Sequence, residues 1–113
     1  MNELLDLTEL RRNIGNDRET ERFLLSEFLS SASESLALLE TQMPDAADEE
    51  YDQIWKSHMH QIKGAALNLG APHLADIAAQ AQCAYAAEPA LKRQILEEVQ
   101  KAFAVLGDYI SRL

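Results

Sequence analysis

The stretch that decides the fold is WKSHMHQIKGAALNLGAPHLADIAAQ, residues 55–80, which contains a glycine and a proline two positions apart. On both sides of this pair, apolar residues recur at spacings typical of amphipathic helices. Gly70 is suited to end the first helix, and Pro72 is suited to the first turn of the second. The stretch therefore predicts a helical hairpin, with one helix over about residues 48–69 and the next over about 72–87.

Two helices are predicted before this hairpin. A short one fits residues 6–14, because Gly15 follows it at a position where the left-handed conformation commonly ends a helix. Asn16 or Asp17 is a good N-cap for a long helix that extends to about Glu40. Its apolar stripe consists of Leu25, Phe28, Leu29, Ala32, Leu36 and Leu39.

A loop at residues 41–47 contains Pro44, and Pro89 begins the last helix. The predicted apolar stripe of that helix consists of Leu91, Ile95, Val99, Ala102, Leu106, Tyr109 and Ile110. No segment alternates with the period of two that a strand requires. We therefore predict a single all-α domain over residues 1–113, an antiparallel four-helix bundle with a short extra N-terminal helix across one end.

The composition excludes several classes of function. The net charge is −9, which disfavours binding to nucleic acid or to anionic lipid. Cys83 is the only cysteine and is expected to be a small buried thiol, so neither an internal disulfide nor a cysteine zinc site is expected. No apolar run approaches the ~18 residues of a membrane span, and the N-terminus lacks the basic start of a signal peptide. We expect a cytoplasmic protein.

His58 and His60 are expected to face in opposite directions, because two residues on a helix are separated by about 200°. The predicted inward face holds His58 together with Tyr51, Ile54, Trp55, Ile62, Ala65 and Leu69. His58 is therefore interpreted as structural and His60 as exposed. His73, in the first turn of the following helix, is expected at the surface.

The neighbours of His60 favour chemistry at that position. Gly64 lies one turn after it, although glycine inside a helix costs about 0.5–1 kcal/mol relative to alanine. Its missing side chain leaves room for a bulky group beside the imidazole. Lys56 and Lys63 flank His60 and are suited to balance the charge of a phosphoryl group on a neutral imidazole nucleophile. Three further residues of this face are predicted to contact a partner: Leu67, Gln53 and Ser57.

These residues also carry a family resemblance. The segment HQIKGAALNLGAPHLADIAAQAQ, residues 60–82, resembles the signature of histidine-containing phosphotransfer (HPt) domains. His60 matches the phosphorylated histidine, and Lys63-Gly64 matches the pair that follows it. Residues 7–40 resemble the lead-in of the family, a short helix, an Ile-Gly turn and a long helix with two phenylalanines. Met59 is a departure, since many members have alanine there.

The resemblance implies a phosphorelay intermediate rather than an enzyme with an ATP site. His60 would accept a phosphoryl group from a receiver-domain aspartate and pass it to another receiver. Gln82 falls where the family often carries Gln or Glu, and it would hydrogen-bond the histidine or its phosphoryl group. No cofactor is expected in this chain, since the Mg²⁺ belongs to the receiver. The implied partners are response-regulator receivers and a hybrid sensor histidine kinase, and the family leans to monomers.

Three other interpretations remain open. A metal- or haem-binding bundle is disfavoured because His58 and His60 diverge and the sequence contains no Glu-x-x-His. An adaptor that shares the fold without the chemistry is disfavoured by the presence of both His60 and Lys63-Gly64. An inhibitor that docks on a receiver or kinase would present much the same surface, so only the effect of replacing His60 separates it from a transfer protein.

Overall fold

The computed structural model describes residues 3–113, and these form an all-helical bundle, as predicted. The helices are α1 (Thr8–Asn13), α2 (Arg18–Thr41), α3 (Glu49–Leu69), α4 (Pro72–Cys83) and α5 (Pro89–Ser111). Within the described residues, no helix combines the length and apolar character needed to cross a membrane.

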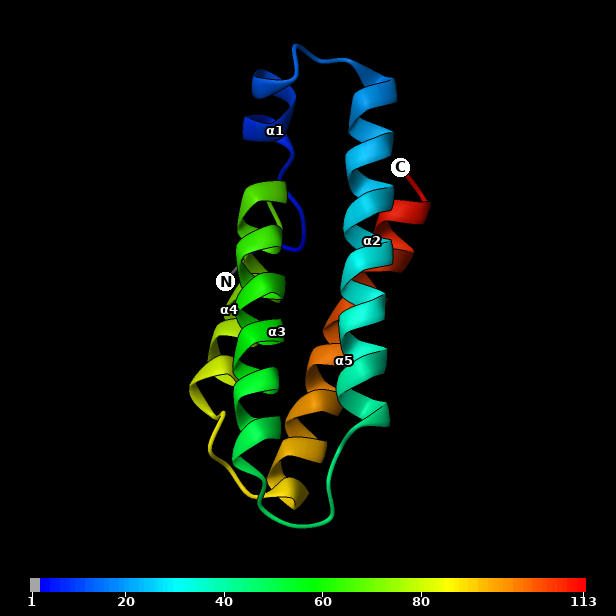
Figure 1. Cartoon of the computed structure of the whole chain (residues 1–113). Helices are drawn as coiled ribbons and strands as arrows, with labels where there is room; N and C mark the ends of the chain where they lie inside the picture. Colours follow the sequence, from blue (N-terminus) through cyan, green and yellow to red (C-terminus); the bar gives the residue numbers. More distant parts are fainter. Residues whose placement is uncertain (1–2) are drawn as a thin grey trace.

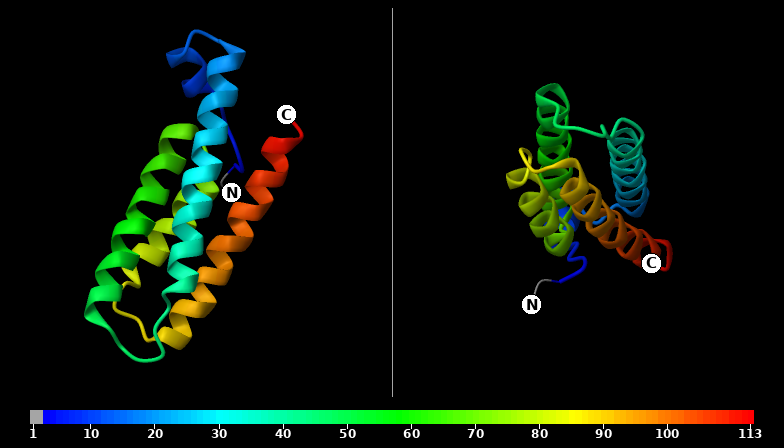
Figure 2. Two further views of the ribbon diagram at one scale, coloured as in Figure 1. Left: turned by 45° about the vertical axis from the view of Figure 1, so that its right-hand side comes forward. Right: turned by 90° about the horizontal axis from the view of Figure 1, so that it is seen from below.

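The four longer helices pack in a ring, with successive helices running in opposite directions (Figures 1 and 2). Each of them contacts the next along the chain, and α5 returns to α2 to close the ring. The first turns of α2 extend past the end of α3, and α1 lies beside this extension (Figure 1). The short N-terminal helix is thus at one end of the bundle, as expected.

The contact between α3 and α4 is the most extensive in the bundle, and α4 contributes buried alanines to the core. Ala75, Ala78 and Ala81 are all buried, and such small side chains let two helices approach closely. Trp55 of α3 is fully buried, and its indole Nε1 donates a hydrogen bond of 2.7 Å to the Ala81 carbonyl. This bond aligns the last turn of α4 with the first half of α3.

The predicted helix ends are formed by local capping. The Asp17 side chain accepts from the Glu19 N–H at 3.1 Å, and the Asp48 side chain accepts from the Tyr51 N–H at 3.1 Å. Gly70 ends α3 with a φ of 97°, and a Cβ there would collide with the Asp6 carbonyl. Glycine at this position therefore serves both the turn and the close approach of the N-terminal segment.

The N-terminal segment is held against the turn between α3 and α4. The Asp6 N–H donates to the Gly70 carbonyl at 2.7 Å, and the His73 N–H donates to the Glu3 carbonyl at 3.3 Å. The Asp6 carboxylate accepts from the N–H and hydroxyl of Thr8, at 3.0 and 2.6 Å, which lowers its pKa. Because Asp6 is used in these contacts, α1 begins at Thr8 rather than at residue 6 and ends at Asn13.

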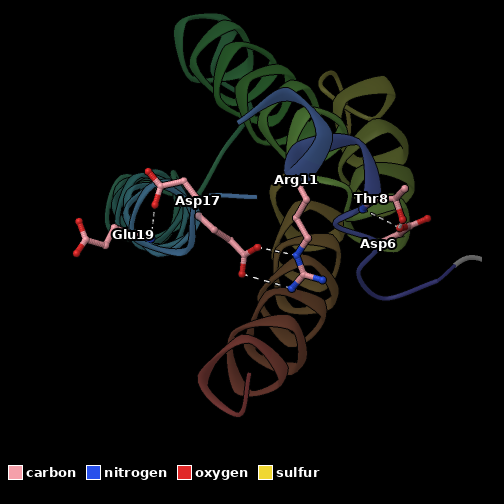
Figure 3. A network of polar contacts seen from close by, with 6 residues as sticks. Asp6, Thr8, Arg11, Asp17 and Glu19 are labelled. Atoms are coloured by element: carbon pink, nitrogen blue, oxygen red, sulfur yellow. Dashed lines mark hydrogen bonds and ion pairs between the residues drawn. The ribbon is translucent and has the colours of Figure 1, made fainter. Parts of the chain in front are cut away.

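An ion pair joins α1 to α2 across the intervening turn. Arg11 Nε donates to Glu21 Oε1 at 2.6 Å, and the second guanidinium bond is 3.4 Å long (Figure 3). The hydrogen bond from Arg11 lowers the pKa of the Glu21 carboxyl. The turn itself contains Gly15 and Asn16 with φ values of 68° and 61°.

Two predictions about α4 are wrong. The helix ends at Cys83 rather than near Ala87, because turns follow in which the Tyr85 and Ala87 N–H groups donate to the Gln82 and Ala84 carbonyls. Cys83 is exposed rather than buried. It lies about 200° around the helix from the buried Ala81 and therefore points away from the core.

The predicted apolar stripe of α5 is also partly wrong. Leu91 and Tyr109 are exposed, whereas Lys92 is only 2% exposed. The Lys92 ammonium forms an ion pair with Asp52 of α3 and lies 5.5 and 5.8 Å from the centroids of the Tyr51 and Trp55 rings. A lysine therefore takes a core position because a carboxylate and two aromatic rings compensate its charge.

Candidate functional site

The structure separates His58 and His60, as the helical spacing predicts. His60 is exposed at the middle of α3, whereas His58 is half-buried. The His58 Nδ1 lies 2.9 Å from the hydroxyl oxygen of Ser35, a buried residue of α2. Between the two histidines, Met59 is fully buried in the core. His58 thus helps to join α3 to α2, and the His60 imidazole is accessible to a partner. His73 is exposed, as expected.

The inward face of α3 is rotated toward α4 relative to the prediction. Ala65 was expected inside and is exposed, whereas Met59 and Ala66 are buried. The alanines of α4 allow a close approach on the side of Met59, so burial extends around the helix in that direction. Ala65 lies on the side of α3 that is turned away from α4, at a position that α2 does not bury.

The two flanks of His60 therefore differ. The Trp55–Ala81 hydrogen bond places α4 on one side of α3. On a wheel of about 100° per residue, Lys56 and Lys63 are displaced toward that side. Gly64 and Ser57 are displaced by similar angles toward α2. Cations thus flank the imidazole on the α4 side, and small side chains flank it on the α2 side.

The space over Gly64 is open. A Cβ added to Gly64 would meet no atom within 4 Å, so packing against this protein does not explain the glycine. Leu67, one turn beyond Lys63, is 58% exposed and provides an apolar group at the edge of the same surface. Gln53 and Ser57 are exposed as well. The surface around His60 therefore has room for a second molecule, and the assignment of these residues to docking remains a prediction.

The two lysines occupy different environments. Lys63 is half-buried. Lys56 is exposed, and its Nζ lies 4.6 Å from the centroid of the Tyr85 ring, in the turns after α4. This distance is in the range of a cation–π interaction. The sequence pattern does not predict this role for Tyr85, because the pattern indicates that the helix continues through its position; the signal present is a single aromatic residue among alanines.

Gln82 is half-buried in the last turn of α4, next to Ala81. Within residues 3–113, no hydrogen bond joins its side chain to His60. The proposed contact with the imidazole or its phosphoryl group therefore remains a prediction. What the structure shows is that Gln82 and Tyr85 belong to the same chain segment, which the indole of Trp55 holds beside α3.

The arrangement as a whole is suited to nucleophilic chemistry. An accessible imidazole, a neighbouring cationic flank and an unobstructed approach are the features that a phosphoryl-accepting histidine requires. Among residues 3–113, no three His, Cys, Asp or Glu side chains are grouped so that they could hold a metal ion.

Comparison with known proteins agrees with this geometry. The family model described as the Hpt domain matches residues 24–113, which include all of α3, α4 and α5 and most of α2. No curated protein and no solved structure matches the chain. Because the family match covers most of the 113 residues, the chain belongs to the Hpt domain family, a family of histidine phosphotransfer modules in two-component signalling.

Proposed function

We propose that His60 is the phosphoryl carrier of a multistep phosphorelay, which accepts the group from one receiver domain and donates it to another. The observation that carries this proposal is the position of His60, the one histidine of α3 that is exposed, one turn before the open space over Gly64. His58 is engaged with Ser35, and His73 lies in the first turn of α4, near the N-terminal segment.

The proposed step is a direct exchange of bonds. The lone pair of a neutral imidazole nitrogen of His60 attacks the phosphorus of an aspartyl phosphate. The P–N bond forms as the P–O bond to the aspartate breaks, and the aspartate leaves as a carboxylate. In the second transfer, a carboxylate of another receiver attacks phosphorus, the P–N bond breaks and the imidazole is released. The Mg²⁺ required belongs to the receiver, and no cofactor is needed from this chain.

The surrounding residues have supporting roles in this proposal. Lys56 and Lys63 balance the negative charge of the phosphoryl group from the α4 side. Gly64 leaves the opposite side clear for the receiver. Gln82 hydrogen-bonds the imidazole or the phosphoryl group, and Leu67, Gln53 and Ser57 contact the partner. We also propose that the protein works as a monomer in the cytoplasm, with receivers and a hybrid sensor kinase as partners.

The test is transfer of labelled phosphate. A receiver domain carrying labelled aspartyl phosphate is mixed with the protein, and the stability of the label in acid and alkali is measured. Acid-labile, alkali-stable label is expected on the wild type, and its complete loss is expected in His60→Gln. His58→Gln and His73→Gln are matched controls that should retain the label, with circular dichroism as the check on folding.

Two outcomes would contradict the proposal. Label on a folded His60→Gln variant would assign the carrier to another residue. A folded wild type that takes no label from a broad panel of receivers would instead favour an adaptor or inhibitor that docks without transferring.

A further inference from the structure

The contact between Lys56 and Tyr85 joins the site to the end of α4. The Lys56 Nζ lies 4.6 Å from the ring centroid, and the Tyr85 side chain is half-buried. Lys56 lies one turn before His60 and on the same face of α3. The ring of Tyr85 is therefore connected, through one lysine, to the surface on which phosphoryl transfer is proposed.

The position of the Tyr85 ring is set by the core. The Tyr85 N–H donates to the Gln82 carbonyl at 3.2 Å, which continues the chain from the last turn of α4. That turn is attached to α3 by the 2.7 Å bond from the Trp55 indole to the Ala81 carbonyl. Trp55 is the residue before Lys56. The same region of α3 thus holds the end of α4 in place and carries Lys56, which Tyr85 contacts from the turn after α4.

We propose that Tyr85 is a positioning residue that holds the Lys56 ammonium on the α4 side of His60. A free lysine side chain has many rotamers, and restricting them in advance reduces the entropy lost when the ammonium is used. The ring also keeps the lysine off the Gly64 side, where the receiver would approach. This inference rests on the proposed function, since it concerns the rate at which His60 takes up phosphate.

A double-mutant cycle tests the inference in the full chain. The rate of transfer from a labelled receiver is measured for the wild type and for Tyr85→Leu, Tyr85→Phe, Lys56→Met and the double variant Tyr85→Leu/Lys56→Met. Tyr85→Leu should slow transfer by about two- to fivefold, the factor expected from a cation–π contact of this kind. Tyr85→Phe should restore nearly the wild-type rate because it keeps the ring. In the Lys56→Met background, Tyr85→Leu should have no further effect.

A second measurement covers the case in which Tyr85→Leu alters the fold. The ring should shift the ε-methylene proton resonances of Lys56 upfield in NMR spectra of the wild type and Tyr85→Phe. The same protons should return to ordinary lysine values in Tyr85→Leu, or in Tyr85→Gln if the leucine variant unfolds. Ordinary values in the wild type would overturn the inference.

The kinetic outcomes separate this inference from the proposed function. A wild type that takes no label refutes the proposed function itself. A wild type that takes label normally, with an unchanged rate in Tyr85→Leu, refutes only the role of Tyr85. Equal slowing by Tyr85→Leu with and without Lys56 also overturns the inference, since it would show that Tyr85 acts through the fold.

Discussion

Two lysines of this bundle lie over aromatic rings, but burial gives them different roles. Lys92 is 2% exposed, is paired with the Asp52 carboxylate and lies over two rings of the core. Lys56 is exposed and lies over the single ring of Tyr85. A buried ammonium must be compensated in place, so Lys92 serves the fold. An exposed ammonium keeps its hydration, so Lys56 remains available to a group that arrives at His60.

Among the variants proposed here for the two lysines, Gly64 and Tyr51, replacement of Lys92 should lower the free energy of unfolding most. Lys92→Met leaves the Asp52 carboxylate without its partner, and removal of one member of a buried pair costs about 3–5 kcal/mol. Because the Asp52 side chain is 20% exposed, we expect a loss of about 2–3 kcal/mol in the free energy of unfolding, measured in urea.

The matched control for this experiment is Lys101→Met, because the Lys101 side chain is 73% exposed. That variant should change the free energy of unfolding by about 0.5 kcal/mol or less. Equal losses of stability in the two variants would contradict a structural role for Lys92.

A large side chain at Gly64 should affect transfer without affecting the fold. Leucine favours the helix more than glycine does, and a Cβ at position 64 would meet no atom within 4 Å, so Gly64→Leu should not lower the stability of the fold. Transfer from a labelled receiver should slow by about tenfold or more, since the side chain enters the space beside His60; a factor of ten corresponds to about 1.4 kcal/mol.

Ala65→Leu is the matched control for the Gly64 variant. Ala65 is the next residue and is exposed, but it lies about 140° around α3 from His60. Transfer should therefore be close to the wild-type rate. Equal rates in the two leucine variants would show that open space at Gly64 is not what the reaction needs.

The smallest predicted effect concerns Tyr51, which belongs to the buried region around Lys92. Its hydroxyl donates to the Leu39 carbonyl at 2.7 Å, and burial raises its pKa from 10.0 to about 12. A pKa raised by folding stabilises the native state below pH 10, and this contribution is lost as the pH rises toward 12. As the pH is raised from 8 to 11, the free energy of unfolding of the wild type should therefore fall by about 1 kcal/mol more than that of Tyr51→Phe.

Urea unfolding of both proteins at the two pH values measures this difference. Parallel losses of stability in the wild type and in Tyr51→Phe would show that Tyr51 ionises as an ordinary exposed tyrosine.

The sequence by itself determined the helices, their order and the exposure of His60. Apolar spacing and the breaks at Gly70, Pro72 and Pro89 act within a few residues, so they can be recognised without the fold. Asp17 is one of the two N-caps that the sequence offers for α2. The opposite orientations of His58 and His60 follow from helix geometry alone. The match to the Hpt family over residues 24–113 likewise comes from the sequence alone.

Tertiary structure decided which side chains fill the core and which lie beside the site. Apolar periodicity predicts that Ala65 and Leu91 lie inside. In the structure, the close approach of α4 buries Met59 instead, and Lys92 is buried because it pairs with the Asp52 carboxylate of α3. Tyr85 reaches Lys56 across a separation of 29 residues because the indole of Trp55 holds the end of α4 against α3. Such contacts depend on how closely two helices pack, a property of both surfaces together that neither segment specifies alone.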